Sequence, residues 1–542
     1  MKVSTERIQM NMLRRFAVGD VLRRHSQRFP DKLAFVWAPK NGEPVEYTYS
    51  QLNRLVNKLA NGLSSHGIKR GDGISVLSLN TYQIPLTMAV AKIGVYITPI
   101  NPMLNTEAIT YILKQSEVKF LFVEDTFINE IKTELSTFTG LNFGFIGISG
   151  YKEIPATWID IQDIIEESPD QEPEVEINGE DILTLTYTSG TEAFPKGVVL
   201  THLNWYASIL GLQSDSYKGI LESDVNLESL PMFYTGGMCV GLYPLLVGGT
   251  VVNTYIPDPP RMVEMMGRYK VSYVILPPTL YLRLLKVTGI SEAARSLRRC
   301  VSFGATIPEG MIAGWNEVAP HVQWVSLYAS SEPTCFGTVG LYKTISDIPE
   351  KNLGWVGIPS PCLEMKIVDD DDNDVPQGQI GEIVFRGPVV MKEYFKDKEK
   401  TEEAFAGGWL HSGDLGRLSE RGDLFFVDRK KDMIKSGGEN IPTAEIELAV
   451  GSHSRVSEVA AFGVYHPEWM EALVVAVAPK EGETLTEDEI LQHCRQLLPK
   501  FKVPKYVLIV NEFPRNPTGK ILKRELRVIY KDLALQRGNK NG

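Results

Sequence analysis

Residues 73–100 read GISVLSLNTYQIPLTMAVAKIGVYITPI, and this stretch decides the fold. Apolar residues predominate in 73–79 and in 85–93, and they return in 95–99. The first and last runs predict strands, and the middle run predicts a helix. Strands that alternate with helices in this way indicate a mainly parallel sheet covered by helices.

The same alternation continues along the chain. Leucine and valine residues recur at helical spacing from Leu52 to Leu63, and further strands are predicted at 118–123, 271–277 and 322–327. Near residue 370 the composition changes: residues 369–372 are four aspartates, which predict an exposed turn, and 381–386 and 424–427 predict strands of a smaller β unit. Thr486 and Glu489 form a capping box that starts a later helix.

These patterns predict an α/β protein with more than one domain, because 542 residues exceed the size of one hydrophobic core. We expect a large N-terminal domain of mainly parallel sheets flanked by helices at 1–428, including a small β unit at about 360–428. A hinge at 429–431 would then lead to a mobile, small α+β C-terminal domain at 432–542.

Charge and apolar patterning limit the partners. The net charge of −11 disfavours nucleic acid and anionic lipid, and a binding site for any anionic ligand must be built from local cations and backbone N–H groups. No run approaches the roughly 18 apolar residues of a membrane span, so no transmembrane segment is expected. The best apolar run, Met238–Val252, is interrupted by Gly241 and Pro244 and predicts a buried helix, a turn and a strand.

Cysteine usage and the first residues bear on the compartment. The five cysteines are scattered and form no CxxC pair, which favours a reduced, cytoplasmic setting over a disulfide framework or a zinc site. The polar, basic start at 1–16 is not typical of a secretory signal. The oligomeric state is left open, with a homodimer as one alternative.

A loop after a predicted strand is the first candidate for chemistry. Residues 182–197 read ILTLTYTSGTEAFPKG, so a β-type run ends in Thr188, Ser189, Gly190 and Thr191, followed by Lys196. Hydroxyls, a glycine and a lysine can surround a phosphate. The loop is not a Walker motif, because that pattern ends in Gly-Lys-Ser/Thr. The alternative interpretation is a polar surface hairpin.

Six further segments occur downstream. They are PMFYTGG at 231–237, SFGAT at 302–306, YASSE at 328–332, WLHSGD at 409–414, DRKKDMIKSGG at 428–438 and PRNPTGK at 514–520. Together with the loop they resemble the acyl-adenylate-forming (AMP-binding) superfamily, which includes acyl-CoA synthetases, luciferases and peptide-synthetase adenylation domains. The resemblance covers nearly the whole chain, in the family's order, and is strongest to the carboxylate–CoA ligase branch.

The resemblance implies roles for individual residues. Asp414 would accept hydrogen bonds from the ribose hydroxyls, which suits an acceptor-only carboxylate, and Arg429 would contact ribose or phosphate. Glu332 would hold Mg²⁺ with help from Thr191, because hard oxygen ligands suit that ion. Around adenine and the phosphates the resemblance places Thr188, Ser189, Gly190, Lys196, Gly304, Ala305, Thr306, Tyr328, Ala329, Ser330 and Ser331.

The C-terminal segments would complete the reaction. Lys520 would stabilise the negative charge that builds when a carboxylate attacks the α-phosphate of ATP. Lys431 stands at the family's hinge position, and rotation there would exchange the Lys520 loop for the segment of Lys435, Gly437 and Gly438. That segment would admit the pantetheine arm of coenzyme A for thioester formation.

The resemblance also locates the acid. The resemblance gives Tyr234 a catalytic role and also places it in the acid pocket. The other residues that would line this pocket are Gly236, Gly237, Met238, Ser302, Phe303, Leu327 and Ala329. This set favours a hydrophobic fatty or aromatic acid. No aspartate follows Phe233, and such a residue is common in relatives that activate amino acids. The implied cofactors are ATP, Mg²⁺ and coenzyme A.

Three alternatives remain beside a carboxylate–CoA ligase. A stand-alone adenylating enzyme that loads a separate carrier protein would have nearly the same sequence, and a luciferase-like oxygenase could use the same scaffold. A catalytically weak nucleotide-binding homologue is the third. It is raised by Glu192 and Ala193, which replace the family's usual Thr-Gly, because a glutamate beside a triphosphate repels it.

Overall fold

The computed structural model describes residues 15–148, 154–188, 195–213, 219–305, 307–515 and 521–537. These residues form two compact units. Unit 1 holds residues 1–351, 356–365 and 385–410, and unit 2 holds 352–355, 366–384 and 411–542. The small β unit expected within the large domain therefore contributes residues to both. The hinge predicted at 429–431 falls inside unit 2 and stays a prediction.

The first sheet of unit 1 contains the opening stretch. Its strand order is β19 (Glu393–Tyr394), β9 (Lys196–Thr201), β8 (Ile182–Thr188), β4 (Tyr96–Ile100), β3 (Gly73–Leu77), β5 (Phe120–Glu124), β6 (Asn142–Ile146) and β7 (Ile159–Asp160). From β8 to β7 neighbouring strands are parallel, whereas β9 runs antiparallel to β8 and β19 runs antiparallel to β9. The predicted mainly parallel sheet is confirmed.

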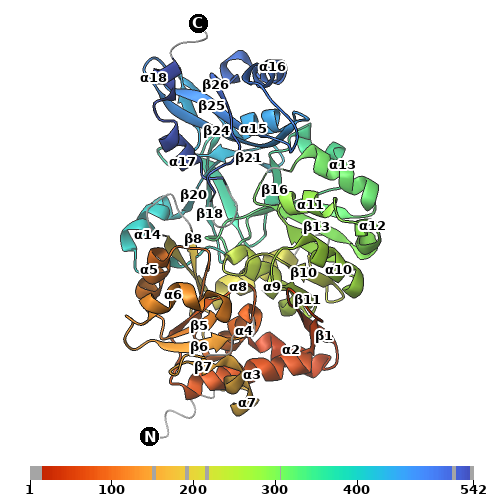
Figure 1. Ribbon diagram of the computed structural model, residues 1–542, viewed down its shortest axis with the longest axis vertical. Helices are drawn as coiled ribbons and strands as arrows, with labels where there is room; N and C mark the ends of the chain where they lie inside the picture. The colour runs from red at the N-terminus through yellow and green to blue at the C-terminus, as the bar shows by residue number, and fades with distance from the viewer. Residues whose placement is uncertain are drawn as a thin grey trace. The chain divides into compact units, whose positions relative to one another are not determined.

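Helices cover this sheet (Figure 1). Alpha-helices α5 (Thr106–Ser116) and α6 (Ile128–Leu135) pack on it through one apolar cluster that includes Ile112, Ile131 and Leu121. Helices α3 (Tyr49–Ser65) and α4 (Gln83–Ile93) pack against each other, and α4 also lies against β4. The predicted helical face of 52–63 is buried, and Thr48 caps α3 through a capping box with Gln51. Helices α2 (Asp20–Arg28), α7 (Ile161–Glu167) and α8 (His202–Gln213) complete this part.

A second run of strands in unit 1 carries the later motifs. Its order is β16 (Trp355–Pro359), β15 (Thr338–Tyr342), β14 (Gln323–Tyr328), β13 (Arg299–Phe303), β12 (Tyr273–Leu276), β10 (Val225–Glu228), β11 (Thr250–Thr254), β1 (Leu33–Ala38) and β2 (Val45–Thr48). The strands from β14 to β1 are parallel. The remaining helices are α9 (Thr235–Val247), α10 (Pro259–Tyr269), α11 (Pro278–Leu284), α12 (Ile290–Ala293), α13 (Glu309–Val318) and α14 (Lys398–Ala404).

Helix α9 and strand β11 are the buried helix and strand predicted for 238–252. Pro244 lies inside α9 and has no N–H to give to the carbonyl of Val240. Asn226 on β10 donates from Nδ2 to that carbonyl at 3.0 Å. A buried side chain thus replaces the hydrogen bond that the proline removes, and it fixes α9 on the sheet.

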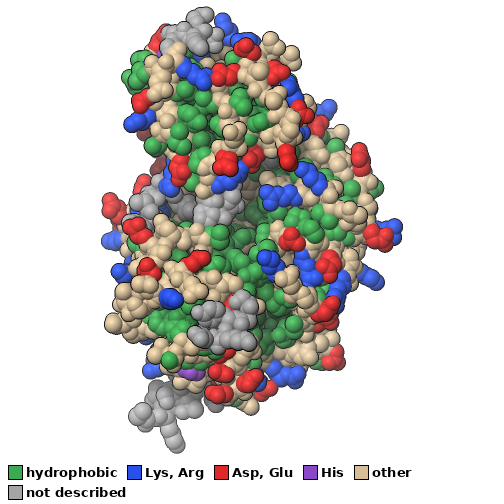
Figure 2. All heavy atoms as spheres, in the orientation of Figure 1, with side chains coloured by type: hydrophobic (Ala, Val, Ile, Leu, Met, Phe, Trp, Pro, Cys, Tyr) green, Lys and Arg blue, Asp and Glu red, His purple; other side chains and the backbone are tan. Residues whose placement is uncertain are grey.

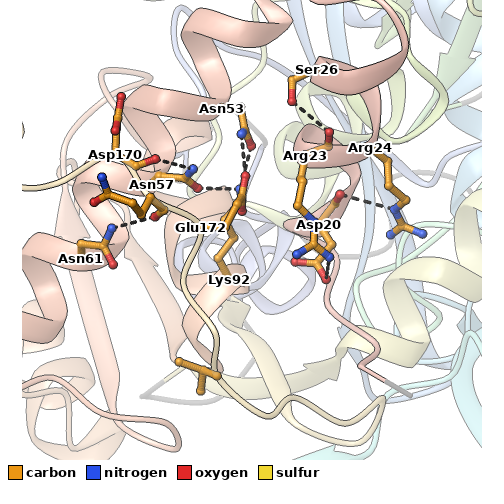
Figure 3. A network of polar contacts seen from close by, with 12 residues as sticks. Asp20, Arg23, Arg24, Ser26, Asn53, Asn57, Asn61, Lys92, Asp170 and Glu172 are labelled. Atoms are coloured by element: carbon orange, nitrogen blue, oxygen red, sulfur yellow. Dashed lines mark hydrogen bonds and ion pairs between the residues drawn. The ribbon is translucent and has the colours of Figure 1, made fainter. Parts of the chain in front are cut away.

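A buried lysine ties the approach to β8 onto the helices. Lys92 is fully buried, and its Nζ donates to Asn53 Oδ1 at 2.7 Å, Asn57 Oδ1 at 2.6 Å and Glu172 Oε2 at 2.7 Å (Figure 3). Burial lowers the pKa of Lys92, and the Glu172 carboxylate opposes that shift. The three acceptors satisfy the ammonium. They anchor the segment that enters β8 on α3 and α4.

Unit 2 contains most of the strand run β17 (Glu364–Val368), β18 (Gly381–Arg386), β20 (Leu410–Leu418) and β21 (Leu424–Arg429). Its second sheet has the order β23 (Glu439–Ile441), β22 (Ile434–Ser436), β25 (Met470–Pro479) and β24 (Val456–His466), with β26 (Tyr506–Ile509) paired to β25. The helices are α15 (Thr443–Gly451), α16 (Glu487–Leu497), α17 (Lys523–Ile529) and α18 (Leu533–Arg537). The predicted capping box of Thr486 and Glu489 starts α16.

The second sheet of unit 2 is covered on both faces. Odd-numbered residues of β25 such as Leu473 pack with α15 and α16, and even-numbered ones such as Val474 pack with α17 and α18. Side chains of a strand alternate between faces, so β25 is apolar at every residue from Ala472 to Ala478. This confirms the small α+β C-terminal unit expected from the sequence.

The described residues include no helix long and apolar enough to cross a membrane. Figure 2 shows basic and acidic side chains interspersed over the visible face. In that view the described residues form no broad basic surface of the kind that binds nucleic acid.

Candidate active site

The predicted phosphate loop connects two paired strands. Thr188 at the end of β8 pairs with Lys196 at the start of β9, so the loop joins an antiparallel hairpin. Ser189, Gly190 and Thr191, like Glu192 and Ala193, lie outside the described residues. Their predicted roles, including the share of Thr191 in metal binding, stay predictions. The two flanking residues show where the loop begins and ends: at the carboxyl edge of the parallel strands, where open α/β sheets bind ligands.

The side chain of Tyr394 connects this hairpin to the predicted metal ligand. The Nζ of Lys196 lies 5.2 Å from the ring centroid of Tyr394, a cation–π distance. The hydroxyl of Tyr394 donates to Oε1 of Glu332 at 3.2 Å. Tyr394 reaches this position because β19 pairs with β9. The structure therefore brings a lysine of the phosphate loop and the predicted Mg²⁺ ligand to opposite ends of one tyrosine.

Glu332 sits in a turn that several buried groups fix. Its carbonyl accepts from the N–H of Met391 at 2.6 Å. Within the turn, the N–H of Cys335 donates to the carbonyl of Ser330 and that of Thr334 to Ser331. The Thr334 carbonyl then accepts from the hydroxyls of Ser208 at 2.9 Å and Tyr243 at 3.0 Å. These bonds hold the predicted Ser330, Ser331 and Glu332 in one rigid turn.

The predicted adenine-binding residues meet at the ends of two neighbouring strands. Phe303 of β13 lies opposite Leu327 of β14 in the parallel register. Gly304 and Ala305 therefore leave the sheet beside Tyr328 and Ala329. Gly304 has φ +79° and is exposed, which makes it the residue that lets the chain turn out of β13. Thr306 lies outside the described residues.

The start of α9 holds the residues predicted for the acid pocket. Tyr234 precedes the helix, and its hydroxyl accepts from Nδ2 of Asn101 at 2.9 Å. Burial raises the pKa of Tyr234 to about 12, so the hydroxyl stays protonated at neutral pH. A Cβ on Gly237 would lie 2.3 Å from the carbonyl oxygen of Pro231, whereas one on Gly236 would lie 3.8 Å from Phe303. Only glycine fits at 237.

Two further pocket residues are buried. Met238 is fully buried in α9, and Ser302 is buried on β13 with an Oγ that has no hydrogen-bond partner among the described residues. Of the predicted pocket residues, Tyr234, Gly236, Phe303, Leu327 and Ala329 keep part of their surface exposed.

Unit 2 contains the predicted ribose, hinge and coenzyme A residues. Asp414 of β20 lies opposite Arg429 of β21, and the Nε of Arg429 is 3.3 Å from Oδ1 of Asp414. The structure thus pairs the residue predicted for the ribose hydroxyls with the residue predicted to contact ribose or phosphate. Lys431 follows two residues later, and its side chain is exposed.

The predicted coenzyme A segment forms the turn between β22 and β23. The N–H of Lys435 donates to Oε2 of Glu471 at 2.7 Å, and that of Gly437 donates to the carbonyl of Trp469 at 3.0 Å. Gly437 and Gly438 have φ +60° and +87°, backbone conformations that favour glycine. Lys520 lies outside the described residues, so its catalytic role stays a prediction.

Two contacting residues were missed by the sequence interpretation. Tyr394 binds Glu332 across 62 positions, and Asn101 binds Tyr234 across 133. A signal existed for Asn101, because a polar residue two positions after the predicted strand 95–99 lies at the ligand-binding edge of a parallel sheet. Tyr394 had no comparable signal, because β19 has only two residues.

Comparison with known proteins decides the family. A family model described as AMP-binding enzyme matches residues 22–395, and one described as AMP-binding enzyme C-terminal domain matches 445–520. The chain belongs to the AMP-binding enzyme family. The resemblance inferred from the seven motifs is confirmed.

Curated relatives of this AMP-binding enzyme include acid–CoA ligases of nearly equal length. The long-chain-fatty-acid–CoA ligase FadD13 of Mycobacterium tuberculosis is 30% identical over 518 residues, which cover 95% of this chain and 98% of FadD13. The indoleacetate–CoA ligase of Aromatoleum aromaticum is 30% identical over 510 residues, covering 93% and 96% of the two chains. Among solved structures, ATP-bound MatB from Rhodopseudomonas palustris has a TM-score of 0.83 and 26% identity, covering 95% and 99%.

Proposed function

We propose that this AMP-binding enzyme is an ATP-dependent carboxylic acid–CoA ligase. It forms an acyl-adenylate and pyrophosphate from the acid and ATP, and then transfers the acyl group to the thiol of coenzyme A. The observation that carries the proposal is that Lys196, at the end of the phosphate loop, and Glu332 both contact Tyr394, in a chain that both family models match.

The residues present fit a magnesium ion beside the phosphates. Glu332 is half-buried and offers a carboxylate, and its Oε2 has no hydrogen-bond partner in the described part of the chain. Mg²⁺ takes carboxylate and phosphate oxygens as ligands. When bound, the ion would neutralise charge on the phosphates. Tyr394 would orient Glu332 through its hydroxyl, and Lys196 would add a positive charge at the end of the phosphate loop.

The other residues supply binding and charge stabilisation. Gly304, Ala305 and Tyr328 would enclose adenine, and Asp414 with Arg429 would bind ribose. Tyr234, a hydrogen-bonding phenol at the start of a helix, would orient the acid. Lys520 would approach the reacting carboxylate and the α-phosphate, where preorganised positive charge lowers the barrier.

We also propose two steps that use different parts of unit 2. The loop of Lys520 would serve adenylation, and the turn of Lys435, Gly437 and Gly438 would serve thioester formation. Rotation at 429–431, with Lys431 as the hinge residue, would exchange them. A few residues with solvated side chains suffice for such a hinge.

The acid is proposed to be hydrophobic, either a fatty or an aromatic acid. The relatives act, by their names, on long-chain fatty acids and on indoleacetate. The predicted pocket agrees, because Met238, Phe303 and Leu327 are apolar and Gly236, where an added Cβ would meet only Phe303 at 3.8 Å, leaves space beside Tyr234. We also propose a cytoplasmic location, because the cysteines are free thiols and thiols stay reduced in that compartment.

Acid-dependent pyrophosphate release tests this function. The full chain is incubated with millimolar ATP and Mg²⁺ and a panel of fatty and aryl acids, with and without coenzyme A. We expect some acids to stimulate pyrophosphate release, and mass spectrometry to find their acyl-CoA esters when coenzyme A is present. If no acid stimulates release, the enzyme is not a ligase of this kind.

A lysine variant separates the two steps. Lys520→Ala should lower adenylation about 100- to 1000-fold, as loss of an oxyanion donor does in other enzymes, yet retain thioester formation from a supplied acyl-adenylate. Lys531→Ala, an exposed lysine of the same unit, is the matched control and should keep both steps. Loss of both steps in Lys520→Ala alone would contradict the division between the two segments.

A further inference from the structure

A buried carboxylate contacts both sides of the Asp414–Arg429 pair. Glu382 lies on β18 and is 6% exposed. Its Oε1 accepts from the N–H of Gly413, directly before Asp414, at 3.0 Å. Its Oε2 accepts from the Nζ of Lys430, directly after Arg429, at 3.0 Å. One side chain therefore holds the neighbours of both ribose-binding candidates.

The turn before Asp414 depends on these contacts. Gly413 has φ +69°, a left-handed conformation, and its carbonyl accepts from the N–H of Lys430 at 2.9 Å. Ser412 Oγ accepts from the N–H of Asp414 at 3.1 Å and donates to the carbonyl of Ile383 on β18 at 2.5 Å. The position of Asp414 is thus set by β18 through Ser412 and Glu382.

Lys430 forms ion pairs with two carboxylates, and Glu382 is the buried one of the two. Lys430 also contacts Oδ1 of Asp370 at 2.9 Å, but the Asp370 side chain is 88% exposed. His411 Nδ1 lies 3.4 Å from the same Oε2 of Glu382. Although burial acts in the opposite direction, hydrogen bonds from Lys430 and Gly413 lower the pKa of Glu382, which is therefore ionised at neutral pH.

We propose that Glu382 is a positioning residue for nucleotide binding. It acts through Gly413 and Lys430, which it holds so that Asp414 and Arg429 keep the spacing that the ribose hydroxyls require. The inference rests on the proposed function and deepens it, because it adds a residue that would not touch the nucleotide.

Substitution can separate the two contacts of Glu382. In Glu382→Gln the amide oxygen can still accept from Gly413, but the charge that faces Lys430 is gone. An ionic hydrogen bond contributes more than a neutral one, and removing one partner leaves the other charge without compensation. Lys430→Met removes the same contact from the other side. Asp370→Asn removes only the exposed partner of Lys430, and exposed ion pairs contribute little.

Calorimetric titration of the full chain with AMP tests the proposal without requiring turnover. We expect Glu382→Gln to bind AMP about tenfold more weakly than wild type, which is the change that loss of one charged hydrogen bond causes. Asp370→Asn is the matched control and should bind as wild type does. Because Glu382 and Lys430 form one network, Glu382→Gln with Lys430→Met should weaken binding less than the sum of the single changes.

Two readouts distinguish positioning from a structural role. A purely structural Glu382 would lower the unfolding temperature and the active fraction but leave the dissociation constant of AMP and the KM for ATP unchanged, and that result would overturn the proposal. Should Glu382→Gln not fold, Lys430→Met carries the same test with the same expected direction. If wild type binds AMP but activates no acid, that result refutes the ligase function and leaves the positioning role of Glu382 standing.

Discussion

The two carboxylates proposed to act on the nucleotide, Glu332 in unit 1 and Asp414 in unit 2, are held in different ways. Glu332 sits in a turn fixed by backbone and hydroxyl bonds, and within the described part of the chain its side chain receives one hydrogen bond, from Tyr394. Asp414 is 3% exposed and faces Arg429 at 3.3 Å. A rigid backbone positions the first, and paired charges position the second.

This difference indicates different tasks. A carboxylate whose second oxygen is open can take a metal ion without first giving up a partner. A buried carboxylate must be paired, since an unpaired buried charge is costly. Asp414 is suited to hydrogen-bond neutral hydroxyls while Arg429 compensates its charge. The comparison predicts that changes at Glu332 act on the reaction rate and that changes at Asp414 act on nucleotide affinity.

Glu332→Gln should have the largest effect. The amide keeps the shape of the side chain and can still accept from Tyr394, but it removes the charge offered to Mg²⁺. Metal-based charge stabilisation contributes several kcal/mol to such reactions, so acid-dependent pyrophosphate release should fall by about 100-fold or more. The unfolding temperature should stay within a few degrees of wild type. A normal rate at millimolar Mg²⁺ would exclude Glu332 as the metal ligand.

Asp414→Asn should come next and should act on affinity. It removes the charge that Arg429 faces and weakens the bonds to ribose, so the dissociation constant of AMP should rise about tenfold or more. The rate at saturating ATP should change less than in Glu332→Gln. The comparison between the two carboxylates fails if Asp414→Asn lowers the saturated rate and leaves the AMP affinity intact.

A pair of neighbouring glycines tests packing in unit 1. Gly237→Ala would place a Cβ 2.3 Å from a backbone oxygen, and overpacking of this kind costs about 1–3 kcal/mol of unfolding free energy. Gly236→Ala is the matched control: its Cβ would make an ordinary contact at 3.8 Å, in a helix that favours alanine. Chemical denaturation measures both. Equal stabilities would show that the backbone at 231 moves to make room.

Gly413 in unit 2 limits substitution for another reason. Apart from its chain neighbours, no atom of the described residues lies within 4 Å of its added Cβ, but its φ of +69° is a left-handed conformation that costs about 1–2 kcal/mol for other residues. Gly413→Ala should therefore lose stability and, because it precedes Asp414, AMP affinity as well. Gly237→Ala should lose stability without that change in AMP affinity.

The sequence predicted the fold wherever one pattern repeats. The strand–helix–strand stretch at 73–100 appears as β3, α4 and β4, and the helix at 52–63 as α3. The first rests on continuous apolar runs, since every residue of β3, α4 and β4 is buried, and the second rests on apolar residues at helical spacing. A single segment displays either pattern by itself. The division near residue 370 was harder, because residues 366–384 and 411–428 belong to unit 2 although they precede the predicted hinge. Amino-acid composition shows where one kind of segment gives way to another. It does not show with which unit a segment packs.

The candidate site was predictable only in part. Residues at strand ends, such as Phe303 and Leu327, follow from the parallel sheet, which places carboxyl ends together. Tyr394 and Glu382 contribute by contacts between distant segments, and neither lies in a motif that the sequence interpretation used. Their roles depend on which strands pair, and one sequence does not display strand pairing.

Tyr394→Phe should have the smallest effect and sharpens the comparison most. The phenyl ring keeps the cation–π contact with Lys196, so only the hydroxyl bond to Glu332 is lost. A single hydrogen bond of this kind contributes about 0.5–1.5 kcal/mol, so we expect a rise of a few-fold in the Mg²⁺ concentration that gives half the maximal rate. Tyr394→Ala, which also removes the ring beside Lys196, should raise the KM for ATP in addition. If the phenylalanine variant raised the KM for ATP and left the Mg²⁺ requirement unchanged, Tyr394 would serve the phosphate loop and not Glu332.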